Sequence, residues 1–139
     1  SAQIDLAIDH FMQAIKDPLY EIPEKSYTNA GLCVLKRNDF EQAKEYLQKA
    51  LIIRPDYPLA VLGLIQVDYL SRNLRVAQTN ITRYIQSYPL SADSLWLAIR
   101  IEHALGNDQA VASYGAQLQR RFPDSNEARS LREGKLRDE

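Results

Sequence analysis

The sequence has few of the residues that mark disulfide-bonded, metal-binding or membrane-spanning proteins. Of its 139 residues, one is a cysteine, Cys33, and two are histidines, His10 and His103. A single cysteine cannot form an intramolecular disulfide, and no cysteine or histidine group has the spacing of a zinc site. No apolar run reaches the roughly eighteen residues of a membrane span. The first residues also lack the basic start and apolar stretch of a signal peptide.

An excess of one charge is also absent. The chain has 17 lysines and arginines against 18 aspartates and glutamates, which gives a net charge of -1. Proteins that bind duplex nucleic acid cluster basic residues to neutralise phosphates, so nucleic acid is not expected as a partner. Glycine-rich phosphate loops, HExxH and GxSxG motifs are missing as well. We therefore expect a protein that is not an enzyme and that uses no cofactor or metal.

What the sequence does contain is an internal repeat. Prolines recur at a step of 34 residues, and so do residues that favour the N-cap of a helix. The repeated positions are Pro55, Pro89 and Pro123, and Asp39, Asn73 and Asn107. Because two physically different constraints share one period, the repeat is a structural unit. A step of about 34 residues is the length of a tetratricopeptide (TPR) repeat.

The residues inside one unit predict two helices. An apolar stripe at helical spacing, Tyr27, Ala30, Gly31 and Val34, is followed by the polar stretch 36–39. Asp39 then opens a second helix with Gln42 at the capping-box position. The apolar stripe of the second helix includes Ala43, Leu47 and Ala50, and Pro55 ends it because proline disfavours a helical residue before it.

These residues resemble the TPR family. The resemblance implies an all-α, right-handed solenoid of antiparallel helix pairs, with about three and a half repeats and a C-terminal capping helix. We expect one domain over 1–139, composed of the helix 3–16 (helix B of a truncated repeat), the repeats 24–57, 58–91 and 92–125, and the capping helix 126–137. Ile65 and Ile99 replace the small Gly31, so the paired helices should pack less closely there. An ordinary helical bundle is the alternative, but a bundle has no reason to keep a fixed step.

In TPR folds the first helix of each repeat lines a concave groove, and the resemblance implies which residues line it here. They are Lys25, Thr28, Leu32, Leu35, Leu59, Leu62, Gln66, Tyr69, Asp93, Trp96, Arg100 and His103. The positions that hold a peptide carboxylate in some TPR modules carry Thr28 and Leu32, so the groove should prefer an apolar strip of protein. Trp96 and Arg100 lie one helical turn apart and could act together. Alternatively, several of the leucines pack between adjacent repeats.

One segment resembles a narrower family. Residues 112–125 (ASYGAQLQRRFPDS), and less specifically 17–20 (DPLY) and 43–51 (AKEYLQKAL), are similar to the type IV pilus pilotins, the PilF/PilW family. Gly115 lies in the first segment. It interrupts a helix, and it is either a tolerated defect or a point of close approach by a neighbouring helix or a partner.

The pilotin resemblance implies a function. Members are periplasmic lipoproteins on the inner leaflet of the outer membrane, and they help the pilus secretin reach that membrane and assemble. Members also have more repeats and a lipidated N-terminal cysteine, which this chain lacks. We expect a monomeric protein that binds the secretin subunit and contacts the membrane only through an N-terminal lipid anchor absent from this chain. The alternative is a cytoplasmic TPR adaptor that binds a peptide or helix of another protein.

Overall fold

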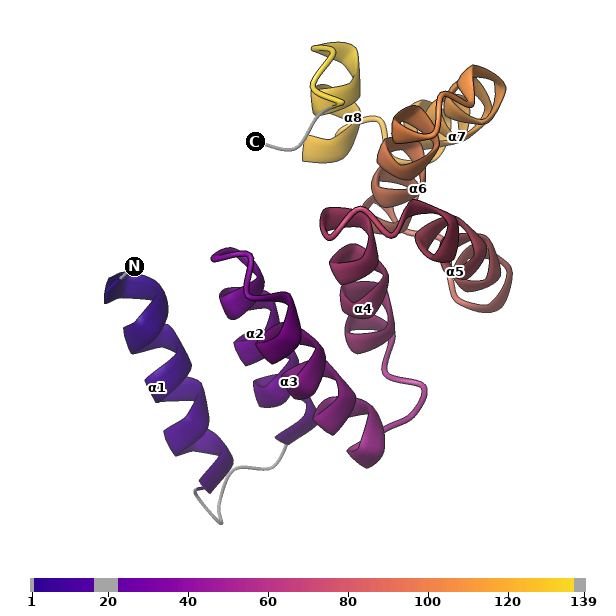
Figure 1. The fold of residues 1–139 in the computed structure, drawn as a ribbon. Coiled ribbons are helices and arrows are strands. Elements are labelled where there is room, and N and C mark those ends of the chain that lie inside the picture. The colour runs from indigo at the N-terminus through magenta and orange to yellow at the C-terminus, as the bar shows by residue number, and fades with distance from the viewer. Residues whose placement is uncertain (1, 17–22, 137–139) are drawn as a thin grey trace. The chain divides into compact units, whose positions relative to one another are not determined.

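The computed structural model describes residues 2–16 and 23–136, and every regular element within these ranges is an α-helix (Figure 1). The chain forms two compact units, Ser1–Arg72 and Asn73–Glu139. The first unit holds α1 (Ala2–Lys16), α2 (Pro23–Leu35), α3 (Phe40–Ile53) and α4 (Pro58–Leu70), and the second holds α5 (Leu74–Ser87), α6 (Ala92–Ala104), α7 (Asp108–Arg121) and α8 (Asn126–Arg132). The expected connection at residues 17–20 lies outside the described residues. A single domain over 1–139 stays a prediction.

The turn inside each helix pair uses the same backbone conformation at a step of 34 residues. Asn38, Arg72 and Gly106 have positive φ angles of 61°, 67° and 76°. Around Gly106, two backbone N–H groups donate to the carbonyls of His103 and Glu102 at 3.0 and 2.9 Å. These bonds are the Schellman arrangement, which satisfies carbonyls that the end of a helix leaves without a partner. The repeat therefore extends to a backbone feature that the side chains alone did not reveal.

The residues predicted as N-caps occupy N-cap positions. Asp39 caps α3 by accepting a hydrogen bond from the N–H of Gln42 at 3.2 Å. Asn107 caps α7 in the same way through the N–H of Ala110 at 3.5 Å, whereas Asn73 precedes α5 without a side-chain bond. The N-cap prediction is thus confirmed in position, and in chemistry at two of the three helices.

The reciprocal capping box lies at Ser91 and Ser94, which the sequence reading did not identify. The N–H of Ser94 donates to the Ser91 hydroxyl at 3.1 Å, and the N–H of Ser91 donates to the Ser94 hydroxyl at 3.2 Å. The side chain of Gln42, expected to play this part at α3, instead donates to the Tyr46 hydroxyl at 3.5 Å. A serine at the third helical position can therefore replace the usual Glu or Gln.

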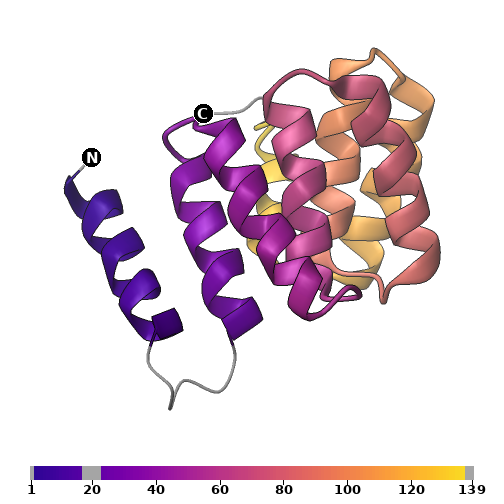
Figure 2. The ribbon, with the colours of Figure 1, turned by 60° about the horizontal axis from the view of Figure 1, so that its bottom comes forward.

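In the first unit, α2, α3 and α4 lie side by side, with α1 beside α2 (Figure 2). Their shared core is built around Leu47 of α3, which is fully buried. A Cβ atom at Gly31 of α2 would lie 2.9 Å from Leu47 Cγ, and one at Gly63 of α4 would lie 3.0 Å from Leu47 Cδ2. Real side chains do not approach so closely, so Leu47 packs between two glycines that let both neighbouring backbones come near.

In the second unit, α6, α7 and α8 share a core of four fully buried residues, Leu95, Ile99, Leu118 and Ala128. Ile99 stands where Gly31 stands in the first repeat, and α6 packs against α7 less extensively than α2 packs against α3. The looser packing expected of this pair is confirmed.

Gly115 of α7 faces the C-terminal helix. A Cβ atom there would lie 3.2 Å from Cδ2 of Leu131, a residue of α8. The glycine therefore admits a close approach by a neighbouring helix, which was one of its two expected roles. The capping helix itself is shorter than the expected 126–137, because α8 ends at Arg132 and Gly134 follows with a φ of 73°.

We expect Leu47→Ala to lower the free energy of unfolding by about 3 kcal/mol, because it removes buried atoms and leaves a cavity that the flanking glycines cannot fill. Ile52→Ala on the same helix is the matched control, since Ile52 is 81% exposed. Its effect should stay within roughly 0.5 kcal/mol. Urea unfolding followed by circular dichroism measures both, and equal losses would contradict the role assigned to Leu47.

Gly106→Ala should cost about 1 kcal/mol of stability, because a side chain disfavours the left-handed conformation. No atom lies within 4 Å of the position where the new Cβ would stand, so the cost comes from the backbone alone. Gly106→Asn should cost less, because asparagine tolerates this conformation. Thermal unfolding of the two variants compares them, and the same loss in both would argue against backbone strain.

Candidate protein-binding surface

The residues expected to line the groove lie on α2, α4 and α6, with different degrees of exposure. Four side chains are exposed: Lys25, Leu59, Asp93 and His103. Five are half-buried: Leu32, Leu62, Gln66, Trp96 and Arg100. Three are buried: Thr28, Leu35 and Tyr69. The role of these positions as a binding surface stays a prediction, and nine of the twelve present part of their side chain to solvent.

The buried members of the set have structural partners in the first unit. The Thr28 hydroxyl donates to the carbonyl of Glu24, one turn earlier on α2, at 2.8 Å. Leu35 belongs to the core, and Leu32 packs partly against it. A Cβ atom at Gly63 would lie 3.4 Å from Leu32 Cδ2, so this glycine lets Leu32 approach α4. For these two leucines the alternative reading, packing between helices, describes what the structure contains.

Trp96 and Arg100 of α6 lie together, as their spacing of one turn predicts. The Arg100 guanidinium carbon is 5.9 Å from the centre of the Trp96 ring, within the range of a cation–π contact. The indole also packs against the core of the second unit. Both large side chains are therefore held in place while remaining partly accessible, which reduces the conformational entropy that a partner must remove on binding.

A buried carboxylate that the sequence reading did not select also lies on α6. Glu102 is only 4% exposed, and its Oε1 accepts hydrogen bonds from the side-chain amides of Gln78 at 2.8 Å and Asn107 at 3.3 Å. It therefore joins α5, α6 and the start of α7. The sequence signal was an acidic residue on an apolar stripe, followed five positions later by an N-cap amide.

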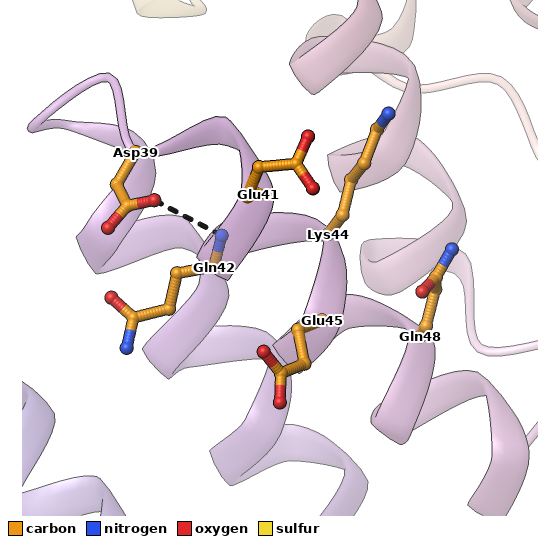
Figure 3. A pocket seen from close by; sticks show the side chains of 6 residues that line it. All are labelled: Asp39, Glu41, Gln42, Lys44, Glu45 and Gln48. Carbon is orange, nitrogen blue, oxygen red and sulfur yellow. Dashed lines mark hydrogen bonds between the residues drawn. The ribbon is translucent and has the colours of Figure 1, made fainter.

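A shallow hollow of about 610 Å³ lies along the outer side of α3 (Figure 3). Only polar and charged residues line it: Asp39, Glu41, Gln42, Lys44, Glu45 and Gln48. Small-molecule sites combine apolar walls with polar groups that converge from several elements. All six lining residues come from α3 and its cap, so the hollow lacks the form of an active site.

Comparison with known proteins decides the family. The sequence is 31% identical over 121 residues to the type IV pilus assembly protein PilF of Pseudomonas aeruginosa. The fold matches a crystal structure of PilW, a widely conserved type IV pilus biogenesis factor, with a TM-score of 0.75 and 34% identity over 94% of this chain. A crystal structure of Pseudomonas aeruginosa PilF matches with a TM-score of 0.68 and 28% identity over 96% of this chain.

The chain is homologous to the PilF and PilW proteins.

The homology confirms the fold class, because this all-helical chain has the fold of the TPR solenoid proteins PilW and PilF. The chain spans about half of PilF, 48% of its sequence, and 60% of the PilW structure. No protein-family model matches the sequence. The family resemblance seen in residues 112–125 falls on α7 and the turn before α8, where Gly115 meets Leu131.

Two further properties concern the residues that the structure describes in this PilF homologue. Across residues 2–16 and 23–136, no three His, Cys, Asp or Glu side chains gather in a way that could hold a metal ion. Over the same ranges, none of the helices combines the length and hydrophobicity of a membrane span.

Two carboxyl groups meet where α6 and α8 begin. The side chain of Glu127 is hydrogen-bonded to that of Asp93, and partial burial together with this contact raises the pKa of Glu127 above its ordinary value of 4.5. Asp93 also contributes, after burial and Tyr88, to raising the pKa of Tyr84, whose ring stacks on that of Tyr88 at 4.4 Å. Like charges at this distance favour a protonated carboxyl, so the pair is a site of pH-dependent stability.

Glu127→Gln should raise stability at neutral pH relative to acidic pH. A raised pKa in the folded state means that the folded protein binds more protons, so the contribution of Glu127 becomes less favourable as pH rises above about 4.5. Glutamine does not titrate, and the stability difference between variant and parent should therefore grow from about pH 4 to about pH 7. Urea unfolding at several pH values measures this difference.

The matched control is Glu133→Gln, because Glu133 is exposed and pairs with Lys135 at 3.1 Å. This variant should show no such growth. A Glu127→Gln difference that is flat with pH, or that falls toward neutral pH, would contradict the carboxyl contact.

Proposed function

We propose that this chain is a non-catalytic, protein-binding scaffold of type IV pilus biogenesis that acts as a pilotin. In this role it binds the subunit of the pilus secretin and assists its localisation to the outer membrane and its assembly there. The observation that carries the proposal is the similarity to PilF and PilW, in sequence and in structure, over most of this chain. The proposed location is the periplasmic face of the outer membrane, with an N-terminal lipid anchor as the link to the membrane.

The helices α2, α4 and α6 supply the proposed binding surface. In the first unit its accessible members are mostly apolar: Leu32, Leu59 and Leu62 accompany Gln66 and Lys25. In the second unit Trp96 and Arg100 are already in contact, and Trp, Tyr and Arg are the residue types enriched in binding hot spots. The composition fits an apolar strip of a protein partner better than a charged peptide terminus.

Deletion of the gene should remove secretin multimers from outer-membrane fractions, and expression of the full-length protein should restore them. Membrane fractions run on gels that keep multimers intact provide the measurement. Multimers that persist after the deletion would sink the pilotin proposal and leave a TPR adaptor with another partner.

The groove is tested in the same strains. Arg100→Ala should weaken restoration of the multimers, since a hot-spot side chain contributes about 2 kcal/mol or more to binding. Trp96→Ala should do the same, with Trp96→Leu as a packing control because Trp96 contacts the core of its unit. Arg83→Ala, an exposed arginine of α5 outside the proposed surface, should restore multimers fully. Full restoration by Arg100→Ala and Trp96→Ala would place the binding surface elsewhere.

A further inference from the structure

The outer side of α3 presents a continuous stripe that no described helix of its unit covers. Glu41, Glu45, Gln48 and Ile52 are all exposed, and their spacing of four, three and four residues puts them on one face of the helix. The core contacts of α3 are made by other residues, among them Ala43, Leu47 and Ala50. The stripe is therefore not needed to fold the helix pair.

One end of this stripe is apolar. Ile52 is 81% exposed, and Ile53 and Leu59 on either side of the short α3–α4 connection are 47% and 46% exposed. Single exposed apolar residues are ordinary on protein surfaces, but a group of them marks a site of interaction. Three large aliphatic side chains within eight positions of the sequence form such a group.

The other end of the stripe is acidic. It forms the hollow of Figure 3, which three carboxylates and one lysine line. Asp39 caps α3, and Glu45 pairs with Lys49 at 3.6 Å. Glu41 forms no ion pair with any residue that the structure describes, and Figure 3 shows its carboxylate directed away from the cap. A cationic side chain of a partner would therefore be attracted to this end.

We propose that the outer face of α3 is a second docking surface, and that its occupant is an amphipathic helix of another protein. That helix carries a basic residue opposite Glu41 and Glu45 and an aliphatic residue opposite Ile52 and Ile53. Glu41 and Ile52 are eleven positions apart, which is roughly 16 Å along a helix at 1.5 Å per residue. The matching basic and aliphatic residues of the occupant should therefore also be about eleven positions apart.

The charge pattern argues against two other occupants. A second copy of the chain in a symmetric antiparallel contact would place Glu41 of one protomer against Ile52 of the other, which buries a carboxylate against an aliphatic side chain. A membrane of anionic lipids would be repelled by the acidic end. A basic and aliphatic helix satisfies both ends at once. Because α3 carries none of the groove residues, this surface is separate from the one in the proposed function, and it does not depend on that proposal.

The test places a photoreactive side chain, benzoylphenylalanine, at Gln48 of the full-length protein in living cells. We expect a light-dependent adduct with another protein, and mass spectrometry of that adduct should find a helix with the basic and aliphatic spacing described. Ile52→Asp and Glu41→Lys, each combined with the probe, should reduce the adduct at least tenfold. Both substituted side chains are exposed, so the fold should persist, and circular dichroism checks this.

Val76→Asp is the matched control, because Val76 is an exposed aliphatic residue on α5 outside this face, and it should leave the adduct unchanged. An adduct that is absent, that joins two copies of this chain, or that survives Ile52→Asp and Glu41→Lys would overturn the proposal. The restoration of secretin multimers, measured separately with the groove variants, reports on the proposed function whatever the outcome here.

Discussion

The packing of one leucine between two glycines is the contact on which the first unit depends. Leu47 of α3 reaches the backbone of α2 at Gly31 and that of α4 at Gly63, so one buried side chain joins three consecutive helices. In a repeat protein each helix pair buries its apolar face only against its neighbours, and such a contact couples the units of the array. The surface residues of α2 and α4 can vary because this contact does not involve them.

The second unit solves the same problem with different residues. Ile99 replaces the first glycine, the matching position for Leu47 is Gly115, and the space above Gly115 is filled by Leu131 of the short C-terminal helix. A buried carboxylate, Glu102, adds polar bonds that tie α5 and α7 to α6. What remains constant between the units is the backbone turn, with positive φ at Asn38, Arg72 and Gly106, rather than the identity of the core side chains.

Local signals in the sequence predicted the helices well. Proline and N-cap residues act on their own stretch of backbone, so Asp39 and Asn107 mark helix starts correctly. Depth of burial depends on other helices, and the groove set was therefore mixed: Trp96 is partly accessible, whereas Thr28 and Tyr69 are buried. The meeting of Gly115 and Leu131 was open for the same reason, because it depends on where α8 packs. The pair formed by Asp93 and Glu127 joins two helices and left no pattern in the sequence.

The central claim is that a surface built on helices α2, α4 and α6 binds a protein partner. Trp96 is the only tryptophan of the chain, so its fluorescence reports on this surface alone. The most direct measurement is a titration of the purified chain with a secretin fragment that has no tryptophan. The account predicts a saturable blue shift of the emission as the indole loses contact with water, and a loss of about tenfold or more in affinity with Arg100→Ala. Binding detected by calorimetry with no change in Trp96 emission, and no loss in Arg100→Ala, would contradict it.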